Sequence, residues 1–262
     1  MTEESAEVAR EKLEAMTPKA RRTRERLIVA ARVVFERDGF LNARVVDIAG
    51  EAKVAHGTFY TYFDSKTDIF RAVVTEFSPG IYRPDTADRS LTRIQRIERG
   101  NEQFYRVYLQ NLRLMALMEQ AATFDEQLHA MRIQLRHRAE RQILGLVKRQ
   151  QQNGTLGSHL DPDMVASALV AMTTHSFYTW HVTESRDYDF DRANKTLTYL
   201  WANALGLRAE PADEEFYQSL GGAAVALPAK AASRKASARK TAAKVATSDK
   251  SPVKKSAAAP RR

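Results

Sequence analysis

The sequence predicts an all-α protein. Between residues 18 and 220, apolar side chains recur every three or four residues, glycines are few, and no segment alternates like a strand. Hydrophobic residues make up 44% of the 262-residue chain, enough for a core in one large or two small domains. We expect four parts: an acidic extension over 1–17, a three-helix domain over 18–66, a larger helical domain over 67–220, and a basic tail over 221–262.

The first predicted helix ends at Gly39, a residue type that readily takes the left-handed conformation just past a helix. Two short helices joined by a tight turn at Lys53 and Val54 are predicted next, over 45–63. In the second, Phe59 and Phe63 fit a core at helical spacing. The outward face then carries a glycine among polar and aromatic side chains, namely His56, Gly57, Thr58, Tyr60 and Tyr62. This layout is typical of a helix-turn-helix that places its second helix in a DNA major groove.

The outward side chains have two interpretations. They could belong to the core of a helical bundle, but core positions at helical spacing are already occupied, which favours DNA contact for Thr58, Tyr60 and Tyr62. The next helix is expected to open at Asp64 or Ser65, with Asp68 completing a capping box. Lys66 in that first turn opposes the helix dipole, and a DNA phosphate beside it would make the charge favourable. Without DNA, Lys66 would be an ordinary surface charge.

Residues 23–74 resemble the DNA-binding domain of the TetR family of bacterial transcriptional regulators. The resemblance rests on matching positions in all three helices and in the start of the next: Ala31, Phe35, Gly39, Asp47-Ile48-Ala49, Gly57-Thr58-Phe59-Tyr60, Tyr62-Phe63 and Ser65-Lys66. It implies that His56, Thr58 and Tyr60 contact bases or phosphates. It also implies that Arg44, at the start of the second helix, and Lys66 bind the DNA backbone.

Three residues depart from the family pattern. Lys53 stands where a turn glycine is usual, Ala55 where a capping serine is common, and Arg44 where threonine is common. We expect Lys53 to adopt a left-handed conformation and the missing cap at Ala55 to cost about 1 kcal/mol.

The net charge of +9 is located mainly in the tail. Residues 228–262 hold 11 Lys or Arg and one acidic residue, whereas the other 227 residues hold 30 basic and 31 acidic ones. We expect this alanine-rich tail to be disordered and either to bind DNA without reading sequence or only to aid solubility.

A second basic cluster is expected before the first helix. In the TetR family such an arm often reaches phosphates or the minor groove, and here it would contain Lys19, Arg21, Arg22, Arg24 and Arg26.

Apolar periodicity predicts further helices over 86–110, 112–122, 124–152, 161–182 and 190–205. Their number and order resemble the second domain of the TetR family, whose inner helices enclose a ligand. Candidate lining residues, each also compatible with plain core packing, are Phe104, Tyr105, Tyr108, Met115, Met118, Phe124, Met131, Phe177, Tyr178 and Trp180. Methionine-rich walls suit a large apolar ligand, so we expect a lipid-like or aromatic effector.

The resemblance also implies a homodimer in which the last two helices of each protomer form a four-helix interface. Small residues there would allow close helix approach. The candidate interface residues are Ala168, Ala171, Leu197, Trp201 and Ala204.

Catalysis has little support in the sequence. Cysteine is absent, no two of the six histidines have three- or four-residue spacing, and no phosphate-binding loop or nucleophile elbow occurs. We therefore expect no enzyme, no cofactor and no metal. The acidic, helix-prone N-terminus and the lack of a long apolar run indicate a cytoplasmic, nucleoid-associated protein without a membrane partner.

These observations predict a homodimeric regulator that binds a palindromic operator on double-stranded DNA. It is expected to be a repressor released by a small, largely apolar effector. The alternative is an architectural nucleoid protein in which the basic tail dominates binding.

Overall fold

The computed structural model describes residues 15–81 and 90–221. All regular structure in these two ranges is helical, which confirms the all-α prediction. Most of the acidic extension, the segment 82–89 and the basic tail from residue 222 lie outside the described residues.

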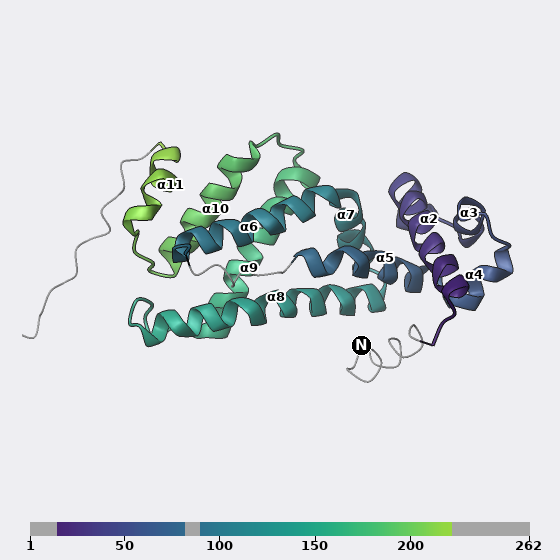
Figure 1. Cartoon of the computed structure of the whole chain (residues 1–262), viewed down its shortest axis with the longest axis horizontal. Coiled ribbons are helices and arrows are strands. Elements are labelled where there is room, and N and C mark those ends of the chain that lie inside the picture. The colour runs from purple at the N-terminus through teal and green to yellow at the C-terminus, as the bar shows by residue number, and fades with distance from the viewer. Residues whose placement is uncertain (1–14, 82–89, 222–262) are drawn as a thin grey trace, which may run out of the picture. The chain divides into compact units, whose positions relative to one another are not determined.

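The helices follow one another in the order shown in Figure 1. Their bounds are α2 Pro18–Asn42, α3 Val45–Glu51, α4 His56–Tyr62, α5 Lys66–Ile81, α6 Arg93–Gln110, α7 Leu112–Ala121, α8 Glu126–Gln152, α9 Pro162–Tyr178, the π-helical turn η1 Thr179–Thr183, α10 Phe190–Ala204, the 3₁₀ turn η2 Pro211–Asp213 and α11 Glu214–Ser219.

Helix α2 begins earlier than expected. The Thr17 hydroxyl accepts a hydrogen bond from the Ala20 amide at 3.3 Å, and Pro18 occupies the first helical position. The basic cluster from Lys19 to Arg26 therefore lies in the first turns of α2, and the prediction of an arm before the helix is wrong. Gly39 has φ 77°, so the glycine interrupts the helix as expected, and three further residues complete α2.

The later helices differ from prediction mainly at their ends. Helix α6 begins at Arg93, not near residue 86, because Thr92 forms a capping box with Gln95. Helix α9 continues as a π-helical turn up to Thr183. The segment η2–α11 was not predicted. It is held by the buried carboxylate of Asp213, which accepts hydrogen bonds from the Thr92 hydroxyl and the Glu210 amide.

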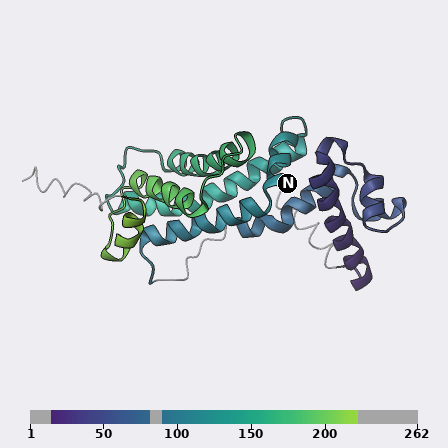
Figure 2. The same ribbon diagram turned by 90° about the horizontal axis from the view of Figure 1, so that it is seen from above.

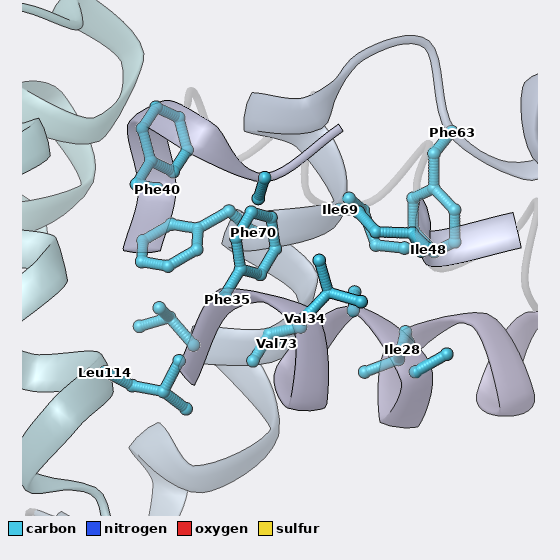
Figure 3. Close-up of a cluster of buried hydrophobic side chains, with 14 of the residues drawn as sticks. Ile28, Val34, Phe35, Phe40, Ile48, Phe63, Ile69, Phe70, Val73 and Leu114 are labelled. Carbon is cyan, nitrogen blue, oxygen red and sulfur yellow. The ribbon is translucent and has the colours of Figure 1, made fainter. Parts of the chain in front are cut away.

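One hydrophobic core joins the three-helix domain to α5, α7 and α8 (Figure 3). The Phe35 ring of α2 meets the Phe70 ring of α5 edge to face, with centroids 4.9 Å apart. Phe40 lies against both rings, and Leu114 of α7 is buried in the same cluster. The three-helix domain therefore completes its core only with residues of the larger domain.

The rest of the larger domain is built on two helix pairs. Helix α8 packs along α9, and α6 packs along α10 (Figure 1 and Figure 2). Two hydrophobic clusters fill this region. One contains Trp201 of α10 and Leu205, which directly follows α10, with Phe216 and Tyr217 of α11, and the other is the aromatic cluster described below.

Candidate nucleic-acid interface

The turn between α3 and α4 is formed without glycine. Lys53 has φ 54°, the left-handed conformation expected for it. The Arg26 guanidinium donates hydrogen bonds to the carbonyl oxygens of Ala52 and Lys53. Arg26 thus satisfies carbonyls at the end of α3 and holds the turn against α2, a role that the sequence analysis missed. Its positive charge beside a helix C-terminus is favourable.

Helix α4 presents one face to the core and the other to solvent. Phe59 is fully buried, whereas His56 and Gly57 are exposed and the Tyr60 side chain is 52% exposed. The rings of His56 and Tyr60 contact each other edge to face at 5.4 Å. Burial of Phe59 fixes the rotation of α4, so that His56, Gly57 and Tyr60 of the predicted outward face are exposed.

Two residues of the predicted contact set are less accessible. Thr58 and Tyr62 are half-buried, and Tyr62 packs against the core that surrounds Phe59. The exposed Thr61, which the sequence analysis did not single out, lies between Tyr60 and Tyr62 on the chain.

The backbone at the start of α4 is open. A Cβ atom added to Gly57 would meet no atom within 4 Å, so internal packing does not require glycine there. Ala55 provides no side-chain cap, as expected, which leaves the first amide groups of α4 without a side-chain acceptor from this position. A glycine with free space around it and uncapped amides suit the approach of a phosphate.

Two cations flank α4 on neighbouring helices. Arg44, the N-cap residue of α3, forms two hydrogen bonds with the Asp47 carboxylate, at 2.7 and 2.8 Å. This ion pair raises the pKa of Arg44 and lowers that of Asp47. Most of the Arg44 side chain remains exposed, so its outer edge can still meet a phosphate.

Lys66 begins α5, where Ser65 and Asp68 form the predicted cap: the Ser65 hydroxyl accepts from the Asp68 amide at 3.1 Å. The Lys66 ammonium donates to the Leu41 carbonyl at 3.0 Å and lies 4.9 Å from the centroid of the Phe40 ring. Partial burial lowers the pKa of Lys66. Lys66 therefore already has an internal role, which ties α5 to the end of α2.

The basic residues of α2 divide into two groups. Lys19, Arg21 and Arg22 are exposed, so Arg22 remains available to DNA. The Arg24 guanidinium lies 5.1 Å from the centroid of the Phe63 ring, and desolvation lowers the pKa of Arg24. Arg24 and Arg26 thus hold the helix-turn-helix together.

The predicted ligand-lining residues do not form one group. Phe104, Tyr105, Tyr108 and Phe177 are buried together, with Met115 and Trp180 against them, and we call this set the aromatic cluster. Met118 is instead buried in the core of Figure 3, and Met131 packs against that core. Tyr178 is half-buried. Phe124 is 54% exposed and is not part of the aromatic cluster.

The predicted dimer residues also divide. Leu197 and Trp201 are buried inside the protomer, where the Trp201 indole donates to the Thr173 hydroxyl at 2.9 Å. Their assignment to a surface is wrong because they pack between α10 and its own neighbours. Ala168 and Ala204 are exposed, and Ala171 is half-buried.

Among the described residues no group of three His, Asp or Glu side chains could hold a metal ion. Within the same residues, no helix has the length and apolar character needed to cross a membrane.

An exposed helix with polar side chains, joined by a tight turn to another short helix and flanked by cations, defines a DNA-binding helix-turn-helix. Residues 27–73 match the family model described as bacterial regulatory proteins, tetR family. The chain therefore carries a TetR-type DNA-binding domain over these residues and is a DNA-binding transcriptional regulator.

Known proteins of the same kind cover most of the chain. It is 28% identical over 182 residues to YdgC of Bacillus subtilis, an uncharacterized HTH-type transcriptional regulator, with 66% of this chain and 88% of that protein aligned. The fatty acid degradation regulator FadR from Bacillus halodurans has the same fold, with a TM-score of 0.58 and 18% identity over 74% of this chain and 99% of that one. GusR of Salmonella enterica superposes with a TM-score of 0.57 and 20% identity over 73% and 98% of the two chains.

Proposed function

We propose that this regulator is a homodimeric repressor that reads a palindromic operator with α4 and leaves it when an effector binds in the larger domain. The exposed face of α4 is the observation that carries the proposal. His56, Gly57 and Tyr60 are accessible on a helix whose rotation is fixed by the buried Phe59. Two such helices would enter successive major grooves about 34 Å apart.

The exposed faces of α9 and α10 are the proposed dimer surface. Met164 is 74% exposed and precedes the exposed Ala168 by one turn of α9. On α10, Leu200 is 43% exposed and precedes Ala204 by one turn. Apolar and small side chains on adjacent turns suit close packing against a second copy.

Side-chain links support communication between the larger domain and the helix-turn-helix. The Arg32 guanidinium of α2 donates to the Gln110 carbonyl at 3.3 Å, at the end of α6. The Arg113 guanidinium of α7 donates to the Glu36 carbonyl of α2 at 3.2 Å. Both links meet the bend between α6 and α7 at Asn111, so an effector that shifts this bend would also shift α2. A coupling of about 1–3 kcal/mol would change operator affinity roughly 5- to 150-fold.

The architectural alternative rests on the basic tail alone. Its high positive charge would add affinity for any DNA, with strong salt dependence. The helix-turn-helix, and the similarity to regulators along most of the chain, favour sequence reading.

Selection of operators from random duplexes tests the proposal. The full chain and residues 1–221 should enrich the same palindromic site at two salt concentrations, with a preference over random DNA of about 10³ or more. Tyr60→Ala should lose this preference, whereas Tyr188→Ala, at a 41% exposed tyrosine outside the helix-turn-helix, should keep it. Loss of all enrichment on removal of the tail would support the architectural alternative.

Sedimentation of the full chain, compared with Met164→Glu, tests the dimer surface, because a glutamate buried in the interface should produce monomers.

A further inference from the structure

Four aromatic rings form a stacked column between α6, α9 and α10. The Tyr105 ring lies between two nearly parallel rings, with centroids 4.1 Å from Phe177 and 4.6 Å from Phe190 and interplanar angles of 10° in both cases. Phe104 also stacks against Phe177, with ring centroids 5.6 Å apart and an interplanar angle of 22°. Parallel stacking of this extent provides flat apolar faces, which recognise another flat ring by the same interaction.

The column reaches the surface at Phe190. This residue is the first of α10, is half-buried, and follows an exposed loop over 184–189. The exposed Arg106 guanidinium lies 5.4 Å from the centroid of the Phe190 ring. Phe190 is therefore the ring that can leave the column at least cost, because only the end of a helix and an exposed loop must move.

An unsatisfied acceptor lies one helical turn beyond Phe190. Asn194 is 3% exposed, and its amide group donates to the Glu98 carbonyl at 3.3 Å. Within the described parts of the chain, no group donates a hydrogen bond to Asn194 Oδ1. A buried oxygen without a donor is costly, so a ligand that brings an N–H or O–H group would gain from this position.

A hydrogen-bonded pair of polar side chains, Tyr105 and His181, also lies beside the column. The Tyr105 hydroxyl and His181 Nε2 are 2.6 Å apart, and His181 lies on the π-helical turn η1, an irregularity frequent at functional sites. Burial raises the pKa of Tyr105 to about 12 and lowers that of His181. This pair is therefore uncharged near pH 7, whereas the Arg106 guanidinium beside Phe190 is a cation.

We propose that α6 and α10 bind a planar aromatic molecule that carries a hydrogen-bond donor. Its ring stacks on Tyr105 in place of Phe190, and its donor group binds Asn194 Oδ1. This proposal names a class of ligand for the proposed effector-binding domain. Binding of the ligand does not depend on the proposed function, but its effect on DNA binding does. Tyr105 lies on α6, five residues before Gln110, whose carbonyl accepts a hydrogen bond from Arg32 of α2. Displacement of Phe190 from Tyr105 would therefore act on the helix that contacts α2.

Calorimetric titration of the full chain with three probes tests this site. The probes are 2-naphthol, its methyl ether 2-methoxynaphthalene, and dodecanoate. We expect 2-naphthol to bind about tenfold more tightly than the ether, the ratio that corresponds to one hydrogen bond of about 1.4 kcal/mol. In Asn194→Leu the two naphthalenes should bind equally, whereas Asn203→Leu, at an exposed asparagine of the same helix, should preserve the difference.

Phe190→Ala provides a second test that does not depend on Asn194. Removal of the competing ring should strengthen the binding of both naphthalenes several-fold. Binding of dodecanoate alone, equal binding of the naphthalenes to the natural chain, or weaker binding after Phe190→Ala would each overturn the proposal. If 2-naphthol binds as expected but leaves the affinity for the operator unchanged, the ligand site is supported and the proposed release of the operator by this class of effector is refuted. If no operator is enriched in the selection experiment, the proposed function fails independently of these titrations.

Discussion

A hydrogen bond between Thr67 and Asp125 fixes the start of α5, directly after the DNA-reading helix, to the start of α8. The Thr67 hydroxyl donates to Asp125 Oδ2 at 2.7 Å, while Asp125 Oδ1 accepts from the amides of Gln127 and Leu128 and caps α8. Loss of the cap costs about 1 kcal/mol, and a hydrogen bond to a partly exposed carboxylate contributes about another 1 kcal/mol. Asp125→Ala should therefore lower the free energy of unfolding by about 2 kcal/mol.

A double-mutant cycle separates the two contributions. Thr67→Val should cost about 1 kcal/mol, and the double variant should cost about 2 rather than 3 kcal/mol, because each single change already removes the shared bond. Urea titrations measure the free energy of unfolding of the three variants. The m value, which is the dependence of this free energy on urea concentration, should be the same in all of them. Thr75→Val is the matched control, since Thr75 is exposed on the same helix and donates only to the Arg71 carbonyl. Strict additivity of the two changes would refute the view that this bond links α5 to α8.

Three further predictions concern the turn, the C-terminal segment and pH. Lys53→Gly should raise the free energy of unfolding by about 0.5–1 kcal/mol in urea titrations, because φ is 54° at Lys53. Asp213→Ala should lower it by about 2–3 kcal/mol by leaving the Thr92 hydroxyl without its buried partner, and limited proteolysis should then cut near α11. Burial raises the pKa of Glu98. Above this raised pKa the buried carboxylate is charged and destabilises the fold, whereas at lower pH it is protonated and the destabilisation is lost. Glu98→Gln should therefore stabilise the protein at pH 7, and thermal unfolding should show this gain shrinking as the pH falls through the raised pKa towards 4; a gain that grows with acidity would contradict the assignment.

The helix-turn-helix was predictable because its signals are local. The spacing of Phe59 and Phe63 indicates the buried side of α4, and burial of one side leaves His56 and Tyr60 on the other. The left-handed turn at Lys53 follows from the position between two short helices. Neither conclusion needs knowledge of the larger domain.

The exposure of large aromatic residues could not be predicted from the sequence. Trp201 and Phe124 were placed from residue type and from the family pattern, but their exposure depends on which helices cross beside them. Trp201 is buried because α9 brings Thr173 within hydrogen-bond distance of its indole. Phe124 is exposed because it lies in the short connection before Asp125 caps α8.

The sequence by itself determined the helical class, the helix-turn-helix and its outward residues, since these depend on contacts between residues a few positions apart. Only the tertiary structure revealed that Arg26 holds the turn after α3, that Tyr105 stacks between Phe177 and Phe190, and that the Asn194 oxygen has no donor among residues 15–81 and 90–221. Each of these depends on residues far apart in the chain. Their distance is set by the packing of whole helices, and that packing is a property of the complete core rather than of any one segment.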